Sequence, residues 1–215
     1  MVDFLNTTFA GFDGGIFRAM HSLAESSGGF FTPFFKVITL LGEKGIIFIL
    51  LAISLMLFKK TRKLGVCMFG AVACGALLTN VLLKEIIARP RPFETNLEFR
   101  GFWEFLGKPL EDGYSFPSGH TTAIASAMVA LFIFCNKKWS WMGFIGVLLM
   151  GLSRIYLIAH YPTDVIAGIV VGAVSGVIAY FITQYIFFLL GKYKDKKFCS
   201  FCLDFDIAKY FKKEK

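Results

Sequence analysis

The sequence predicts an all-α fold, a polytopic membrane bundle of five or six transmembrane helices with amphipathic segments at both ends. The first observation is composition: of 215 residues, 56% are hydrophobic and only 18% are charged, whereas a soluble domain has about 25% charged residues. The second is the length of the apolar runs, which approach the roughly 20 residues that a spanning helix needs. The third is the lack of the alternating pattern that a membrane β-barrel requires.

Residues 1–26 are expected to form an interfacial amphipathic segment. Its apolar side chains recur every three to five positions, as an amphipathic helix requires: Phe4, Phe9, Phe12, Ile16, Met20 and Leu23. Charged residues interrupt them and no basic stretch precedes them, which is not typical of a cleavable signal peptide. Packing of this segment as a core helix is the alternative.

The stretch over residues 30–41 is apolar but short, and it contains Pro33 and Lys36. At 1.5 Å per residue it covers about 18 Å, less than the roughly 30 Å of a hydrocarbon core. We expect an interfacial or tilted first helix that its neighbours extend. Stronger candidates for spanning helices follow, over residues 45–58, 64–84, 120–135, 139–159 and 164–190. The first of these is short, and we expect residues of the stretch before it to extend the helix.

Positive charge is concentrated in alternate loops. Residues 59–63 carry a charge of +4, residues 137–138 carry +2 and the tail after Gly191 carries +4, whereas the long loop over residues 84–120 carries −1. The positive-inside rule therefore predicts that the three basic segments are cytoplasmic, and that the long loop and the corner at His160 share the outer face. The overall charge of +8 is a topology signal and does not indicate a nucleic-acid-binding surface.

We predict three parts: an interfacial segment over residues 1–26, a membrane-embedded domain over 27–191 and a basic cytoplasmic tail over 192–215. The tail interleaves lysine with phenylalanine, so anionic lipid is its expected partner, and a solvated tail is the alternative. Cys199 and Cys202 also lie there. A lone C-x-x-C pair lacks the four ligands of a closed zinc site, so two reduced cysteines are expected.

Polar residues at the edges of the apolar runs carry the candidate chemistry. Lys84 ends one run, and taken alone it is explained by snorkelling of a lysine to the interface. In Arg89-Pro90-Arg91-Pro92 the prolines hold the backbone extended. Both arginines are therefore expected just outside the membrane, with planar forks available to phosphate oxygens.

The next apolar run opens with Pro117-Ser118-Gly119-His120. Ser118 suits the N-cap of a helix, and Gly119 allows another group to approach the backbone closely. The amides and the dipole at such a helix start favour an anion. A structural cap does not explain His120, which at a membrane boundary is expected to exchange protons or to contact a polar substrate.

Arg154 lies within an apolar run, where a buried cation is expected to have a functional partner. A structural ion pair with an acid on another helix is the alternative. His160 follows six residues later, and Tyr161-Pro162 indicates that the helix has ended by then. We expect Asp164 in the first turn of the last helix, where it can reach one imidazole nitrogen of His160.

These residues form an ordered pattern of three motifs, first Lys84 with Arg91-Pro92, then Pro117 to His120, then Arg154, His160 and Asp164. In order and spacing the pattern closely resembles the signature of the type 2 phosphatidic acid phosphatase superfamily. That superfamily includes membrane lipid phosphatases and vanadium haloperoxidases. Arg89 is an additional arginine, because the spacing selects Arg91 as the matched one.

The resemblance implies a role for each matched residue. His160 would be the nucleophile that forms a phosphohistidine, Asp164 would hold its other ring nitrogen, and His120 would act as general acid and then as base. The remaining matched residues would bind the phosphate oxygens: Lys84, Arg91, Ser118, Gly119 and Arg154. Neither a metal nor another cofactor is implied, because side chains supply the positive charge.

The implied activity is hydrolysis of a lipid phosphate or diphosphate at the outer face of the cell membrane. Undecaprenyl diphosphate is favoured over phosphatidylglycerophosphate or phosphatidate, because a compact outward-facing domain fits the recycling of a lipid carrier. A phosphotransferase of the same fold and a non-catalytic lipid-phosphate-binding protein are the alternatives. A metallohydrolase with His120, His160 and Asp164 as zinc ligands is disfavoured by the basic cluster beside them.

Overall fold

The computed structural model describes residues 1–211, and every regular element within them is a helix. The predicted all-α class is thereby confirmed. In chain order the elements are α1 (Val2–Thr8), α2 (Ala10–Ser26), α3 (Thr32–Leu41), η1 (Glu43–Gly45), α4 (Ile46–Met56), α5 (Arg62–Ala76), η2 (Leu77–Leu83), α6 (Lys84–Ile87), α7 (Pro92–Thr95), α8 (Leu97–Phe105), α9 (Gly119–Phe134), α10 (Lys137–Ser140), α11 (Gly143–Tyr156), α12 (Pro162–Lys192), α13 (Lys197–Asp204) and α14 (Ala208–Phe211). The end of the predicted basic tail, residues 212–215, lies outside the described residues.

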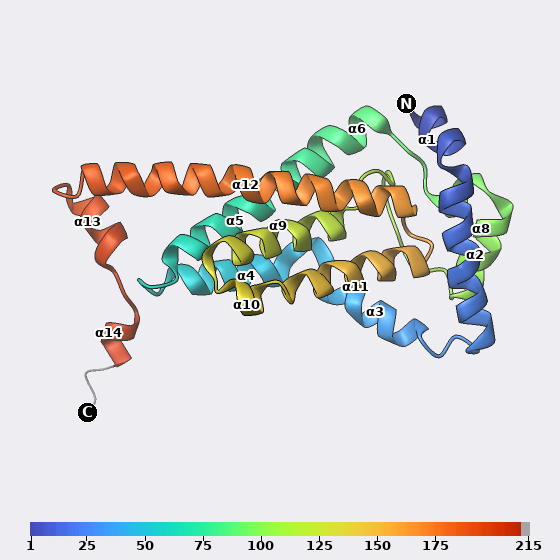
Figure 1. The fold of residues 1–215 in the computed structure, drawn as a ribbon, viewed down its shortest axis with the longest axis horizontal. Coiled ribbons are helices and arrows are strands. Elements are labelled where there is room, and N and C mark those ends of the chain that lie inside the picture. The colour runs from blue at the N-terminus through green and yellow to red at the C-terminus, as the bar shows by residue number, and fades with distance from the viewer. Residues whose placement is uncertain (212–215) are drawn as a thin grey trace.

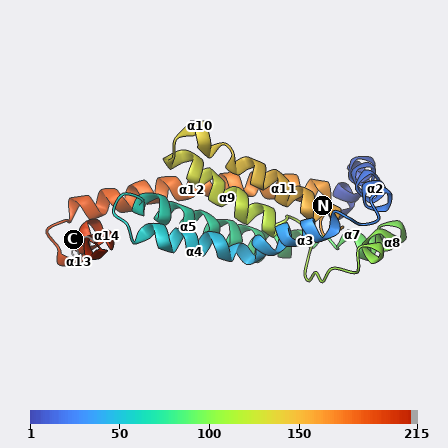
Figure 2. The same cartoon turned by 90° about the horizontal axis from the view of Figure 1, so that it is seen from below.

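Long apolar helices run side by side along the long axis of the molecule (Figures 1 and 2). Among the described residues, three segments are long and apolar enough to cross a bilayer: Thr32–Met56, Arg62–Thr95 and Pro162–Lys192. The apolar helix α9 is shorter and packs between α12, α5 and α11. Because these helices satisfy their own backbone and present apolar surface, the chain is a multi-pass membrane protein.

The first span is longer than the sequence suggested. The predicted helix over residues 45–58 continues from α3, so that Thr32–Met56 forms one segment of 25 residues. The short element η1 kinks this segment, since Lys44 and Gly45 have positive φ values of 49° and 68°. The stretch over residues 30–41 is thus the first half of a span, in agreement with the expectation that its neighbours extend it.

Helices α12 and α9 pack with their backbones in close contact. A methyl group added at Gly168 would lie 2.7 Å from the carbonyl oxygen of Ser118, and one added at Gly172 would lie 2.7 Å from that of Thr122. Only glycine fits at such an approach, as in other tightly packed membrane helices. The packing holds the start of α9 beside the start of α12, and the Ser118 amide donates to the Asp164 carbonyl at 3.1 Å.

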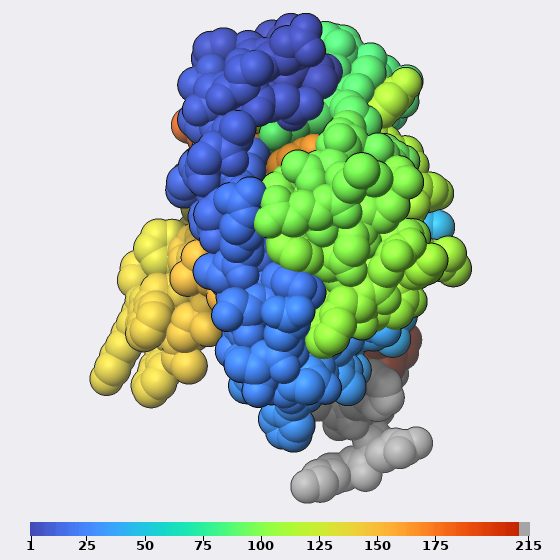
Figure 3. All heavy atoms as spheres, turned by 90° about the vertical axis from the view of Figure 1, so that its right-hand side faces the viewer, coloured from blue at the N-terminus to red at the C-terminus, as the bar shows by residue number. Residues whose placement is uncertain are grey.

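The N-terminal helices cross one end of the bundle. Figures 1 and 3 show α2 running across the axis of α12 and lying beside the segment around α8. Phe17 of α2 is fully buried, with its ring 4.9 Å from that of Phe99 and 5.8 Å from that of Tyr161. Phe4 and Phe12 stay exposed. One face of this segment therefore packs as a core helix, which was the alternative; an interfacial location for its other face stays a prediction.

Two of the three basic segments, the loop at residues 59–63 and the tail, lie at the opposite end of the bundle, whereas α10 with Lys137 and Lys138 lies part-way along it (Figure 1). Lys59 forms an ion pair of 2.7 Å with Asp204 of α13. Arg62 donates hydrogen bonds of 3.0 Å to the carbonyl oxygens of Cys202 and Leu203. The loop at residues 59–63 and the tail thus share one end of the bundle, as two segments on the same side of a membrane must. Which side that is stays a prediction, as do the three-part division of the chain and a lipid partner for the tail.

Candidate active site

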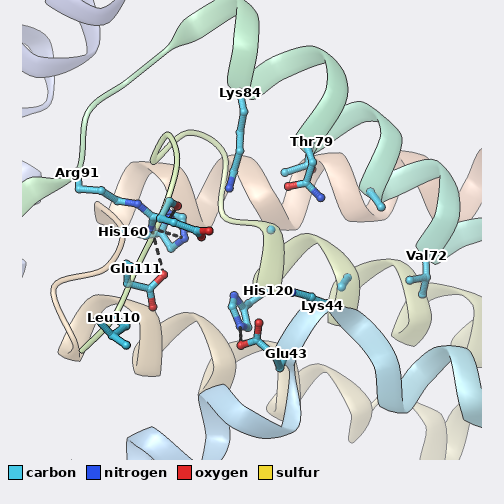
Figure 4. Close-up of a pocket in the computed structure, with 15 residues that line it drawn as sticks. Glu43, Lys44, Val72, Thr79, Lys84, Arg91, Leu110, Glu111, His120 and His160 are labelled. Atoms are coloured by element: carbon cyan, nitrogen blue, oxygen red, sulfur yellow. Dashed lines mark hydrogen bonds and ion pairs between the residues drawn. The ribbon is translucent and has the colours of Figure 1, made fainter.

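A cavity of about 370 Å³ lies between η2, α6, η1 and the start of α9 (Figure 4). It is lined by five of the eight predicted site residues: Lys84, Arg91, Gly119, His120 and His160. The other three are fully buried around it: Ser118, Arg154 and Asp164. Residues from four separate stretches of the chain therefore meet at one site, and the apolar side chains of Val72 and Ala76 continue its wall along α5.

His160 lies in the turn between α11 and α12, and both of its ring nitrogens have partners. Nδ1 lies 2.7 Å from the Ser115 carbonyl oxygen, to which it must donate. Arg91 Nη1 donates to Nε2 at 3.1 Å. These partners select the tautomer with a proton on Nδ1 and a lone pair on Nε2. Nε2 is thus the atom able to attack an electrophile in the cavity.

The surroundings of His160 favour its neutral form. Burial, and after it the positive charges of Arg91 and Arg154, hold the pKa of His160 well below its usual value of 6.5. A protonated imidazole has no free lone pair, so it cannot act as a nucleophile. The site therefore keeps His160 ready to react at neutral pH.

Two buried arginines clamp one carboxylate beside His160. Arg91 is held by the carbonyl oxygens of Ala159, Asp112 and Gly113, at 2.6, 2.6 and 3.0 Å. Its Nη1 lies 3.5 Å from Glu111 Oε2. Arg154 Nη2 pairs with the other oxygen, Glu111 Oε1. This arrangement is an anion site built by planar forks.

One nitrogen of the Arg154 guanidinium lacks a hydrogen-bond partner among the described residues. Its Nη1 donates weakly to Thr39 Oγ1 at 3.4 Å, while its Nε is one of the few buried side-chain atoms of residues 1–211 without a hydrogen-bond partner. Burial of an unpaired donor is unfavourable. The alternative of a structural ion pair is met only in part, since the paired acid, Glu111, belongs to the loop before α9 and not to a helix.

His120 and Lys84 enter the cavity from two sides (Figure 4). His120 Nε2 lies 3.3 Å from Glu43 Oε2 of η1, a partner that the sequence did not predict. An ionised carboxylate can only accept a hydrogen bond, so in this contact the proton of the imidazole is on Nε2. Lys84 reaches in from the start of α6 and is partly buried.

The predicted N-cap of α9 is only partly realised. Ser118 occupies the N-cap position, but its hydroxyl hydrogen-bonds to the Thr121 hydroxyl at 3.0 Å and caps no backbone amide. Its side chain does not line the cavity. Gly119 does line it, and the nearest atom to a methyl group added there would be Asn80 Oδ1 at 3.5 Å. Gly119 and His120 are therefore the residues of this motif that line the cavity.

Asp164 lies where it was expected, in the first turn of α12 and within ion-pair distance of one imidazole nitrogen of His160. Asp164 Oδ2 lies 3.7 Å from Nδ1. It accepts hydrogen bonds from the Tyr161 amide at 3.0 Å and from the Ser115 hydroxyl. This capping arrangement fixes the carboxylate at the helix start, and the Ser115 carbonyl accepts the hydrogen bond from Nδ1.

Arg89 is a component of the site that the sequence interpretation set aside. Its side chain is fully buried and points to the other face of Asp164, donating from Nη1 to Oδ1 at 2.6 Å. It therefore offers no fork to the cavity, contrary to the prediction for both arginines. The only signal in the sequence was the proline that follows it, which restricted its backbone but did not indicate its partner.

Comparisons with known proteins show the family of this chain. The family model of the PAP2 superfamily matches residues 63–188, more than half of the chain. The chain belongs to the PAP2 superfamily. The matched segment contains all eight predicted site residues, whereas Glu43 and the N-terminal helices lie outside it. No solved structure matches the chain.

Relatives carry the names of lipid phosphatases. An undecaprenyl-diphosphatase of Sulfolobus acidocaldarius is 34% identical over 120 residues, 55% of each chain. Undecaprenyl-diphosphatase BcrC of Bacillus subtilis is 29% identical over 163 residues, 75% of this chain and 79% of the relative. A lipid A 4'-phosphatase of Porphyromonas gingivalis is 33% identical over 135 residues, 60% of this chain and 57% of the relative. The match thus spans little more than half the length of the first and third.

Proposed function

We propose that this PAP2 protein hydrolyses a lipid phosphate or diphosphate through a phosphohistidine on Nε2 of His160. The observation that carries the proposal is the carboxylate of Glu111, held by Arg91 and Arg154 beside that nitrogen. A phosphoryl group has the same bidentate acceptor geometry as a carboxylate and a larger charge, so it would displace Glu111. Its phosphorus would then lie next to the lone pair of His160.

Two balanced steps complete the reaction. In the first, His160 Nε2 bonds to the terminal phosphorus while the bond from that phosphorus to the leaving oxygen breaks, and protonated His120 gives its proton to that oxygen. The leaving oxygen is the lipid oxygen of a monophosphate or the bridging oxygen of a diphosphate. In the second, water attacks the phosphohistidine and gives a proton to His120, the bond from nitrogen to phosphorus breaks, and inorganic phosphate leaves. Arg91, Arg154, Lys84 and the Gly119 amide would stabilise the phosphoryl oxygens in both transition states.

Asp164 would support the charge that His160 acquires in the first step. Phosphorylation of Nε2 makes the imidazole cationic while Nδ1 keeps its proton. The Asp164 carboxylate, 3.7 Å from Nδ1, is close enough to stabilise this cation electrostatically, even though the Ser115 carbonyl holds the hydrogen bond. The role is the one implied by the family resemblance, with a different contact.

The shape and the charge of the site favour a lipid substrate on the outer side. The cavity joins a cationic end at Arg91 to an apolar wall at Val72 and Ala76, which suits a headgroup and the start of a chain. The loop at residues 59–63 and the tail lie at the other end of the bundle, and the positive-inside rule therefore supports a site outside the cytoplasm. The names of two relatives favour undecaprenyl diphosphate.

Purified protein assayed against a panel of lipid phosphates and diphosphates tests the proposal. Release of inorganic phosphate, with undecaprenyl diphosphate turned over fastest, is the expected result. Binding of these lipids without release would favour a binding protein, and transfer of phosphate to an added acceptor without free phosphate would favour a phosphotransferase. In membrane vesicles of known orientation, a membrane-impermeant short-chain substrate should be hydrolysed only when the outer face is exposed.

A further inference from the structure

We infer that Asp13 of the N-terminal helix α2 is a positioning residue of the active site, acting through Arg89 on the carboxylate of Asp164. The inference rests on the proposed function, and it extends the catalytic unit to a helix that lies outside the segment matched by the family model. Three buried charged groups carry it: Asp13, Arg89 and Asp164.

Arg89 bridges the two carboxylates directly. Its Nη1 donates to Asp164 Oδ1 at 2.6 Å, and its Nη2 donates to Asp13 Oδ2 at 3.0 Å. The guanidinium carbon lies 3.6 Å from the centre of the Tyr161 ring, on which it stacks. Nε donates to Asn6 Oδ1 of α1 at 2.9 Å. With contacts on every side, this guanidinium has one orientation available.

Asp13 also binds the first turn of α12 itself. Its Oδ1 accepts from the Thr163 amide at 3.0 Å, and its Oδ2 accepts from the Thr163 hydroxyl at 2.8 Å. Thr163 directly precedes Asp164 in the chain. A carboxylate at a helix start satisfies free amides and is favoured by the helix dipole. Asp13 therefore fixes both the backbone before Asp164 and the arginine that holds its side chain.

The charge count gives this cluster a role beyond packing. One guanidinium and two carboxylates sum to −1, whereas Arg89 with Asp164 alone would be neutral. The negative cluster lies on the Nδ1 side of His160, the side opposite to the incoming phosphate. Because charges interact strongly in a buried site, the excess negative charge stabilises the imidazole when phosphorylation makes it cationic. A cluster that only held α2 against α12 would not need this excess of negative charge.

The experiment replaces Asp13→Asn, which keeps the size of the side chain and removes its charge. A matched control is Glu98→Gln, which breaks the exposed ion pair that Arg18 of the same helix makes at 2.7 Å. Phosphate release is measured over a range of substrate concentrations, and folding is checked by thermal melting. We expect Asp13→Asn to lower kcat about tenfold, the ratio that corresponds to one pKa unit of lost charge stabilisation. KM should stay within about twofold, since no substrate contact changes.

The outcomes separate the two proposals. Equal kcat for the wild type and for folded Asp13→Asn would overturn the inference while leaving the proposed function intact. An inactive wild type would overturn the proposed function, and this inference with it. If Asp13→Asn does not fold, Asn6→Asp replaces it, because Asn6 is half-buried on the short helix α1 and accepts from Arg89 Nε. This variant keeps the size of the side chain and adds a negative charge to the cluster, so it should raise kcat at unchanged KM, and an unchanged kcat would equally reject the inference.

Discussion

Two buried arginine clusters flank the imidazole of His160, and they differ in the ratio of their charges. On the cavity side, Arg91 and Arg154 share the single carboxylate of Glu111, an excess of positive charge. On the other side, Arg89 lies between Asp13 and Asp164, an excess of negative charge. The same residue types thus build an anion receptor on one side and a support for a cation on the other.

The clusters also differ in how firmly their acids are held. Asp13 and Asp164 are almost completely buried, and each accepts several hydrogen bonds. Glu111 lies in the loop between α8 and α9, its side chain is 12% exposed, and the hydrogen bonds found for its carboxylate come from Arg154. This difference is the one that the proposed mechanism requires, in which phosphate would replace the acid on the cavity side while the acids on the far side stay in place.

Removal of the imidazole between the clusters should have the largest effect. His160→Ala is expected to lower turnover by at least about 10⁴-fold, because no other group near the clamp supplies the nucleophile. Labelling with ³²P-substrate followed by base-stable phosphoprotein analysis should show a phosphohistidine in the wild type and none in the variant. Substantial phosphate release by a folded, membrane-inserted variant would remove His160 from the mechanism.

Substitution of His120 tests whether a residue on the cavity side also protonates the leaving group. His120→Ala should slow release of an alkyl lipid phosphate by about 10² to 10⁴-fold, the usual contribution of a general acid. An aryl phosphate, whose leaving group needs no proton, should suffer much less. The ratio of the two losses is the measurement, and equal losses on both substrates would count against the general-acid role. Glu43→Gln should give the same selectivity in a weaker form, since its carboxylate lies 3.3 Å from Nε2.

Substitution of Arg154 tests whether the positive cluster binds the phosphate group and stabilises its transition state. Arg154→Ala should lower kcat/KM by about 10² to 10³-fold, because a fixed donor to the developing charge is lost. Arg154→Lys keeps the charge but loses the fork, so its activity should fall between those of the wild type and Arg154→Ala. Substitution of either arginine in this cluster should change KM and kcat together, in contrast to Asp13→Asn. A pure kcat effect for Arg154→Ala would remove the distinction between the two clusters.

The basic residues and histidines of the cavity side could be predicted from the sequence, whereas on the far side only Asp164 could. Lys84, Arg91, His120, Arg154 and His160 stood out because a charged residue at the edge of an apolar run is unexpected, and their order matched a known signature. Asp13 had no such contrast, since it lies in a helix that already carries other charged residues. Its partner Arg89 is 76 residues away, and no local pattern links two such positions.

The fold, like the site, could be predicted from the sequence only in part. The long apolar runs predicted the bundle, because span length follows from composition and bilayer thickness. The kinked first span was missed in part, since Pro33, Lys36 and the turn at Lys44 resemble an interruption when only periodicity is considered. The loop that places Glu111 and Ser115 has neither periodicity nor regular structure between α8 and α9. Its contacts depend on side chains that only the assembled bundle brings together.

The smallest expected effect is a gain in apparent substrate affinity, whereas the variants above lose activity. Glu111→Gln removes the acid that competes with substrate for Arg91 and Arg154. Because substrate no longer has to displace a charged group, KM should fall by about three- to tenfold with little change in kcat. The same variant should melt at a lower temperature than the wild type without ligand, since two buried guanidinium groups lose their counter-charge. Inorganic phosphate should restore that stability more in the variant than in the wild type.

The matched control for this variant is Glu104→Gln, which breaks an exposed ion pair of 2.9 Å with Lys108 near the same loop. It should leave KM and melting temperature nearly unchanged, because exposed pairs contribute little to stability. A rise in KM for Glu111→Gln would mean that the carboxylate helps to recognise the substrate, and the anion receptor would then consist of a different set of groups. A fall in KM for Glu111→Gln, without one for Glu104→Gln, would instead establish that substrate can displace the acid on the cavity side. This property distinguishes Glu111 from the acids around Arg89.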